Sequence, residues 1–257
     1  LNWSSCLSFI TSQAKFCILE CQEKLVPLLE RSFPDIDVNS VNKSLDLERD
    51  DFDFHLPMGS IYKHFIHKIE QNTKIDAYLI PDPVRVNFWK ERLNSLGNGP
   101  YIGICWKSAY MDIKRRPNYA PISDLYPILK LPNVTYVNLQ YTDFANDLNK
   151  IKKEFGVTIH NFNDLDHFND IDDVAALCST LDMVVSTKTT VPLISAGVGS
   201  LTKLANWKQS AWNNILLNPR GPSVDIYERD TCQSWDNVFN SIAEDILNFK
   251  NKKEADG

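Results

Sequence analysis

Residues 181–199 constrain the fold most, because they combine an apolar strand, a polar turn and a short helix within one segment. The turn consists of Ser186, Thr187, Lys188, Thr189 and Thr190. Thr189 or Thr190 is placed to cap the helix that begins near Val191, and Pro192 suits its first turn. Open backbone amides, hydroxyls and the Lys188 side chain together favour an anion such as a diphosphate. An ordinary capped helix with a solvated lysine is the alternative.

Strands and helices alternate along the rest of the chain, which is typical of βαβ units and predicts an α/β fold with parallel sheets. The expected strands are 15–20, 52–55, 101–106, 134–139, 157–159, 183–185, 201–205 and 224–227. The expected helices are 23–33, 61–69, 84–96, 123–131, 143–155, 171–180, 191–196 and 235–249. A glycine- and proline-containing break at 97–100 predicts two domains, 1–97 and 98–250. The polar residues 251–257 predict a disordered tail.

Composition excludes several classes of protein. The formal net charge of −6 over 257 residues argues against a broad nucleic-acid surface. No apolar run approaches the roughly 20 residues of a membrane span, and no secretory signal is present. Six cysteines without a CxxC pair do not indicate zinc, and they are expected as free thiols in a reducing cytoplasm.

Polar side chains follow three of the expected strands, and ligands of open parallel sheets bind beyond the carboxyl ends of strands. The residues expected at this edge are Lys107, Ser108, Gln140, Tyr141 and the turn 186–190. Lys107 is closest to its strand end, and with the basic residues 114–116 it offers charge for a phosphate. A solvated basic loop is the alternative.

An acidic segment, 164–173, precedes the helix expected at 171–180. Asp170 and Asp173 are candidates for hydrogen bonds to ribose hydroxyls. The alternative is that these carboxylates stabilise the positive end of the helix. The five histidines form no metal or catalytic pattern and are expected to be structural or exposed, although His55 follows a strand candidate.

Taken in order, several segments resemble the heptosyltransferase-like glycosyltransferases. The segments are 103–107, 139–141, 170–177 and 181–186 with its threonine turn, and also 19–34 and 52–60. The chain looks similar, over nearly its whole length, to the region that follows tetratricopeptide repeats in bacterial proteins of this kind.

The resemblance implies a GT-B architecture, in which two Rossmann-like domains face each other across a cleft. Residues 1–97 would be the acceptor-side domain, truncated at its N-terminus, and 98–250 would bind a nucleotide-diphosphate sugar. The implied reaction transfers a hexosyl or heptosyl group to an acceptor hydroxyl without a metal or other cofactor. Residues 186–190 and Lys107 would then contact the diphosphate, and the region of Asp170 and Asp173 would lie near the nucleoside.

Two departures from the family pattern bear on activity. Family members carry an aspartate and a histidine in a pattern like D-T-x-x-x-H, where this chain has Lys188 and Leu193. The family's Gly-Asp segment, which often supplies the catalytic carboxylate, would precede Leu1, so the catalytic residue is unassigned. Asp53 and His55 are substitutes for that base. A non-catalytic nucleotide-sugar-binding or interaction module and a nucleotide-sugar epimerase are the alternative functions.

Overall fold

A six-stranded parallel sheet forms the centre of the molecule, with strand order β5–β4–β3–β6–β7–β8. The computed structural model describes residues 1, 4–41, 52–61, 63–64, 77–109, 113, 116–208, 223–230 and 232–256. The strands are β3 (Tyr101–Cys105), β4 (Thr135–Asn138), β5 (Ile159–His160), β6 (Met183–Thr187), β7 (Thr202–Trp207) and β8 (Val224–Arg229). This sheet confirms the α/β class predicted from the alternation of strands and helices.

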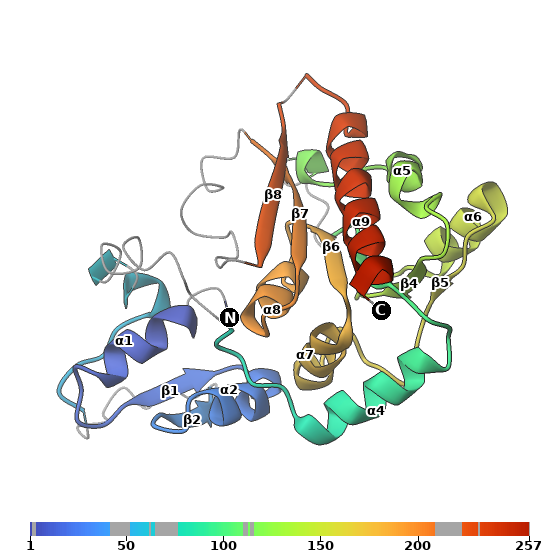
Figure 1. Cartoon of the computed structure of the whole chain (residues 1–257). Helices are drawn as coiled ribbons and strands as arrows, with labels where there is room; N and C mark the ends of the chain where they lie inside the picture. The colour runs from blue at the N-terminus through green and yellow to red at the C-terminus, as the bar shows by residue number, and fades with distance from the viewer. Residues whose placement is uncertain are drawn as a thin grey trace.

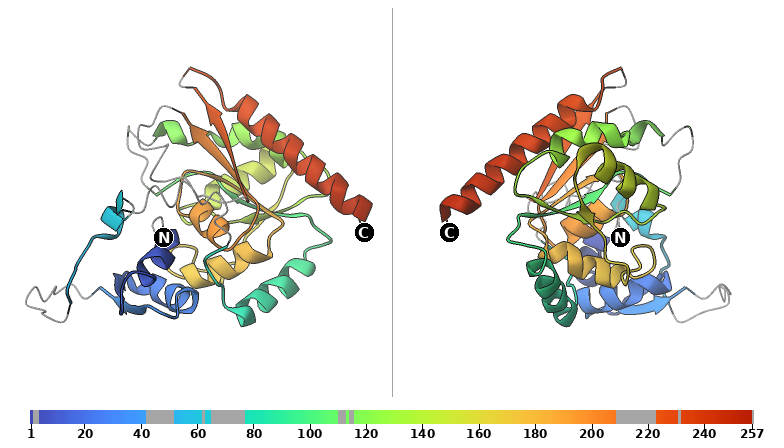
Figure 2. Two further views of the ribbon diagram at one scale, coloured as in Figure 1. Left: turned by 60° about the vertical axis from the view of Figure 1, so that its left-hand side comes forward. Right: turned by 90° about the vertical axis from the view of Figure 1, so that its right-hand side faces the viewer.

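Helices cover both faces of the sheet (Figures 1 and 2). One face carries the 3₁₀ turn η4 (Ile122–Leu125), α5 (Tyr126–Leu129), α6 (Ala145–Phe155) and α9 (Asp236–Asp256), and the other carries α7 (Ile171–Thr180) and α8 (Val191–Gly197). Alternate residues of β6 serve the two faces, because Val184 packs with α7 whereas Met183 and Val185 pack with α9. Gly103 of β3 admits no side chain, since an added Cβ would lie 2.5 Å from Leu139 Cδ1.

A smaller parallel sheet consists of β1 (Ile18–Cys21) and β2 (Asp37–Ser40). The other elements of this first part are η1 (Ser4–Cys6), α1 (Leu7–Thr11), η2 (Glu23–Leu25), α2 (Val26–Ser32) and α4 (Pro83–Asn94). Both η2 and α2, which neighbour the small sheet, contact α7. The segment before α4 is tied to the end of α8, since Tyr78 and Leu79 each donate a backbone hydrogen bond of 2.8 Å to the Gly197 carbonyl.

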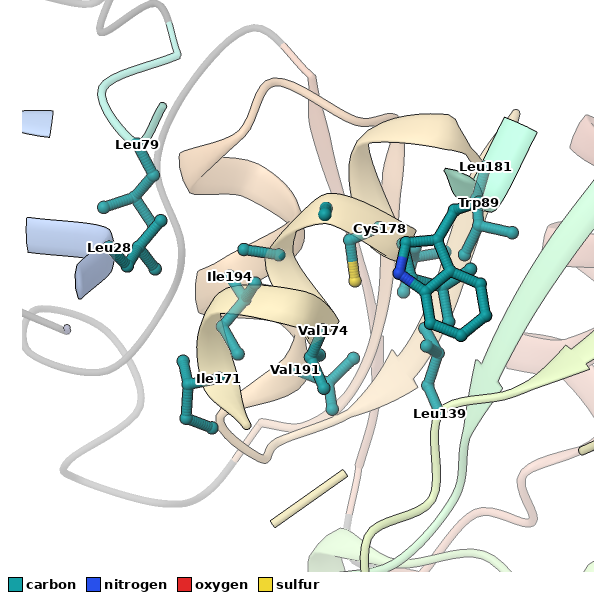
Figure 3. Packing of buried hydrophobic residues seen from close by; sticks show 14 of the residues in the cluster. Leu28, Leu79, Trp89, Leu139, Ile171, Val174, Cys178, Leu181, Val191 and Ile194 are labelled. Carbon is teal, nitrogen blue, oxygen red and sulfur yellow. The ribbon is translucent and has the colours of Figure 1, made fainter. Parts of the chain in front are cut away.

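One apolar cluster spans both sides of the 97–100 break. Figure 3 shows Leu28 and Trp89 of the first part together with Val174 and Ile194 of α7 and α8. The Trp89 ring lies 4.9 Å, between centroids, from that of Phe162. The two parts are therefore packed together through α7. The division into domains at residue 97 stays a prediction.

Most expected helices and strands are present, but two expectations, the strand 52–55 and the disordered tail, are wrong, and one strand was missed. Residues 52–55 form no strand, and Phe54 is 89% exposed. Strand β2 was not expected. The tail is helical, because α9 continues to Asp256, and the buried Lys250 donates a hydrogen bond to the Pro132 carbonyl. Residues 62 and 65–69 of the expected helix 61–69, like the basic residues 114 and 115, lie outside the described residues.

None of the described helices has the length and apolarity that crossing a membrane requires. Within the same described ranges, no group of three or more histidine, cysteine or acidic residues is arranged to hold a metal ion.

Candidate functional site at the carboxyl edge of the sheet

The polar segments expected at the strand ends do lie together. β3 pairs with β6 so that Cys105 is opposite Ser186, and β3 also pairs with β4. The Sγ atom of Cys105 is 3.6 Å from Thr189 Oγ1, which brings the 186–190 turn against the end of β3. The carboxyl ends of three adjacent strands, β4, β3 and β6, therefore present Tyr141, Lys107 and this turn along one edge.

The 186–190 turn has two buried residues and three more accessible ones. Ser186 and Thr187 are the last residues of β6, and each is 1% exposed. Thr189 Oγ1 accepts a hydrogen bond from the Val191 amide at 3.3 Å, whereas the exposed Thr190 makes no side-chain cap. The Thr189 hydroxyl therefore caps α8, and the exposed Thr190 side chain makes no capping hydrogen bond to this helix.

Lys188 is half-buried beside the ends of β7 and β8. Burial lowers the pKa of its ammonium group to about 8, and the Glu228 carboxylate acts in the opposite direction. Glu228 in turn accepts a hydrogen bond of 2.9 Å from the Asn206 amide. A bound anion would restore the pKa of Lys188, because an adjacent negative charge favours the charged form.

Three buried polar atoms near this edge lack hydrogen-bond partners: Thr187 Oγ1, Asn206 Oδ1 and Arg229 Nε. They belong to the ends of β6, β7 and β8. Buried polar atoms in folded proteins are nearly always paired, so three unpaired atoms at the ends of adjacent strands indicate a polar environment at this edge. Asn206 and Glu228 did not emerge from the sequence, although a polar residue ending an apolar strand was the signal used for the other strand ends.

Lys107 is held at both its main chain and its side chain. Its ammonium group donates to Asp147 Oδ2 at 2.6 Å, and the same oxygen accepts from Trp106 Nε1 at 2.9 Å. Gln140 accepts from the Lys107 amide at 3.0 Å and donates to the Lys107 carbonyl at 2.8 Å. The direction of the Lys107 side chain is thus fixed by its neighbours.

Gln140 and Tyr141 have different surroundings, although both follow β4. Gln140 is fully buried, and its amide joins the ends of β3 and β4. Tyr141 is half-buried and donates from its hydroxyl to Ser108 Oγ at 3.2 Å, while burial raises its pKa. Ser108 and Tyr141 are thus brought together at the edge, and the buried Gln140 side chain holds the ends of β3 and β4 together beneath them.

The acidic segment binds arginines of the first part of the chain. Asp173 is 6% exposed, and it accepts from Arg85 at 2.7 and 2.6 Å and from Trp89 Nε1 at 2.6 Å. Asp170 caps α7 by accepting from the Asp173 amide at 3.0 Å. Asp170, which is exposed, therefore matches the structural alternative, because it caps the helix. Asp173 instead pairs with Arg85 and Trp89, which neither alternative predicted.

Two further ion pairs join the first part of the chain to the same acidic segment, Arg31 with Asp172 and Arg92 with Asp164. Together with Arg85 and Asp173 they form an arginine–aspartate seam between the two parts of the chain. The histidines that the structure describes are consistent with the structural or exposed roles expected for them. His167 is buried with Nε2 3.0 Å from the Asn138 carbonyl, and burial lowers its pKa. His55 is exposed.

Comparison with known proteins gives one relative by sequence and several by structure. No family model matches the chain. Protein FlbA of Caulobacter vibrioides is 30% identical over 250 residues, which cover 91% of this chain and 41% of that protein. The chain therefore spans less than half the length of this relative.

Solved structures with a similar fold include glycosyltransferases. The ADP-heptose LPS heptosyltransferase II of E. coli matches with a TM-score of 0.66 at 9% identity, covering 98% of this chain and 95% of that chain. A glycosyl transferase family 9 protein from Veillonella parvula matches with a TM-score of 0.60 at 11% identity, covering 95% and 87%. At these identities the likeness concerns the fold, and the chain has the mixed α/β fold with parallel sheets of the GT-B heptosyltransferases.

Proposed function

We propose that this chain transfers a sugar from a nucleotide-diphosphate donor to an acceptor hydroxyl. The observation that carries the proposal is that Lys107, Lys188 and the turn hydroxyls follow two adjacent strands at the carboxyl edge of a parallel sheet with this fold. A solved E. coli heptosyltransferase with the same fold is described with ADP-2-deoxy-2-fluoro heptose, at a TM-score of 0.52 and 10% identity. An ADP-sugar is therefore the first donor to test.

In the proposed reaction, an oxygen of the acceptor hydroxyl attacks the anomeric carbon of the sugar. A bond forms between these two atoms, the bond from the anomeric carbon to the diphosphate oxygen breaks, and a base takes the hydroxyl proton. Negative charge grows on the leaving diphosphate, and the ammonium groups of Lys107 and Lys188 offset it. No cofactor or metal is proposed, and the identity of the base is left unassigned.

The other edge residues have graded roles in this proposal. Ser186, Thr187, Thr189, Thr190 and Ser108 lie around the diphosphate position. Tyr141 and Asp170 face the nucleoside, whereas Gln140 and Asp173 support the site from the interior. We further propose that 98–250 is the nucleotide-sugar domain and 1–97 the acceptor-side domain. We also propose that the enzyme is cytoplasmic and that a repeat domain lies upstream of this chain.

Replacing Lys188 tests the diphosphate contact. We expect Lys188→Ala to weaken ADP binding by about 1–3 kcal/mol, because a charge-assisted contact is lost. Wild-type affinity should also fall as pH rises above 8, where the Lys188 ammonium with its pKa of about 8 loses its proton. Calorimetric titration with ADP and other nucleoside diphosphates between pH 7 and 9 measures both effects.

Matched variants make this experiment decisive. Lys188→Arg keeps a charge over the whole range and should abolish most of the pH dependence. Lys152→Ala, an exposed lysine on α6, should bind like the wild type. Equal affinities of Lys188→Ala and the wild type would remove Lys188 from the site. ADP binding without hydrolysis or transfer of the sugar of any nucleotide-sugar donor would favour a non-catalytic binding module.

A further inference from the structure

Asp147 is the residue that determines where the Lys107 ammonium lies, although the two residues are 40 positions apart in sequence. It occupies the first turn of α6, and its Oδ2 atom accepts from both Lys107 Nζ and Trp106 Nε1, at 2.6 and 2.9 Å. Trp106 is 1% exposed, so its indole cannot move without disturbing the core. The carboxylate is therefore anchored to a fixed donor as well as to the lysine.

The same contact places a negative charge beside the proposed anion site. The side chains of Lys107 and Asp147 are 26% and 21% exposed, so solvent screens their charges only partly. A phosphate that reaches Lys107 comes within roughly 5 Å of the Asp147 carboxylate, where two negative charges repel each other. The lysine attracts the anion, and its partner reduces that attraction.

We infer that Asp147 positions Lys107 and at the same time weakens diphosphate binding, so that the diphosphate product can leave the site. The inference rests on the proposed function, since it names a control on release from that site. Asp147 is a positioning residue, because it acts on the anion through Lys107 and through its own charge, without a contact to the reacting atoms.

The variant Asp147→Asn separates the charge from the hydrogen bonds. Its amide oxygen still accepts from Lys107 and Trp106, and the negative charge is removed. We expect about a tenfold lower dissociation constant for ADP, and the gain should shrink as salt is raised. A residue with only a structural role would give unchanged or weaker binding.

A double-mutant cycle ties the effect to Lys107. Lys107→Ala should bind ADP more weakly than the wild type, and Asp147→Asn should bring much less improvement when Lys107 is absent. Asp182→Asn is the matched control, because Asp182 pairs with Lys253 at the same 2.6 Å but precedes β6, at the opposite edge of the sheet. It should leave ADP affinity unchanged. Unchanged or weaker ADP binding by Asp147→Asn, or an equal gain without Lys107, would overturn the inference.

Titration with inorganic pyrophosphate separates this inference from the proposed function. If pyrophosphate binds through Lys107 and tightens in Asp147→Asn while no nucleotide binds, the inference stands and the nucleotide-sugar proposal fails. If ADP binds with no dependence on Lys107 or Asp147, the proposal stands and the inference fails. If neither ligand binds, both fail.

Discussion

Thr187 carries a buried hydroxyl oxygen with no hydrogen-bond partner, at the last position of β6. Leaving such an atom unpaired in the interior costs free energy, and removing it with a side chain of the same shape relieves that cost. We expect Thr187→Val to raise the free energy of unfolding by about 1 kcal/mol. Urea unfolding followed by circular dichroism measures this change.

Thr202 supplies the control for that substitution. It is also fully buried, but its hydroxyl contacts Ser195 Oγ at 2.8 Å and donates to the Ser200 carbonyl at 2.9 Å. Thr202→Val leaves those partners unsatisfied and should lower the free energy of unfolding. Equal destabilisation by both substitutions would mean that Thr187 does have a partner. A loss of ADP affinity in Thr187→Val would support its place beside the diphosphate.

At single positions, the sequence identifies residues that follow strands but not the direction of their side chains. Strand ends in a parallel sheet share one edge, which is why Lys107 and the 186–190 turn could be expected together. The inward turn of Gln140 depends on the main chain after β4, and no local pattern encodes it. Asp147 was equally hidden, because its link to Lys107 exists only once α6 has folded against β3.

Among the secondary-structure elements, α7 joins the two parts of the chain through acidic residues in and before its first turn. The Asp173 side chain is 7% exposed and bonded to Arg85, whereas the Asp164 side chain is 56% exposed and bonded to Arg92. We expect Asp173→Asn to lower the free energy of unfolding by about 1.5–3 kcal/mol, because the buried side chain loses its charge-assisted hydrogen bonds to Arg85, which is itself 37% exposed. Asp164→Asn should cost less than about 1 kcal/mol, as exposed ion pairs do.

Chemical unfolding of the two asparagine variants measures this difference. Both substitutions keep the shape of the side chain and remove one charge opposite an arginine, so burial is the main difference between them. Similar free energies of unfolding for the two variants would contradict a larger contribution from the buried Asp173–Arg85 pair.

Elements with strong apolar runs were predictable, and those held by their neighbours were not. α7 begins and ends where its sequence pattern indicates, at Ile171 and Thr180. Strand β2 contains one buried residue, Val38, and depends on pairing with β1. Residues 52–55 alternate like a strand, but they find no partner strand among the described residues. The end of α9 is charged, but it contacts the rest of the molecule through Lys250, which donates to the Pro132 carbonyl, and through Lys253, which pairs with Asp182.

Across the whole molecule, the alternation of strands and helices was enough to predict the fold class, because few arrangements bury both faces of a parallel sheet. The packing of α4 on α7 was not predictable from the break at 97–100. A glycine- and proline-containing segment interrupts local structure, but it does not determine which surfaces meet afterwards. The arginine–aspartate seam and the apolar cluster across it are long-range contacts without a local signal.

Global stability should fall in mildly acid solution because His167 is buried as a neutral ring. Burial lowers its pKa from the unfolded value of 6.5, and the ring contacts the Asn138 carbonyl at the end of β4. Below that value the unfolded chain binds a proton that the folded chain does not, so the free energy of unfolding decreases as pH falls. The decrease continues until the pH reaches the lowered pKa of the folded protein. Urea unfolding at pH 7.5, 6.0 and 5.0 measures it.

Two substitutions assign this pH dependence. His167→Gln removes the titrating group and keeps a donor for the Asn138 carbonyl, so it should flatten the decrease between pH 6.5 and 5. His55→Gln changes an exposed histidine and should retain the wild-type slope. Burial also lowers the pKa of the half-buried His160, so a remaining shallow slope in His167→Gln is expected and should disappear when both are replaced. A wild-type stability that is constant from pH 7.5 to 5.0 would contradict the neutral, buried His167, since linkage then requires equal proton binding by both states.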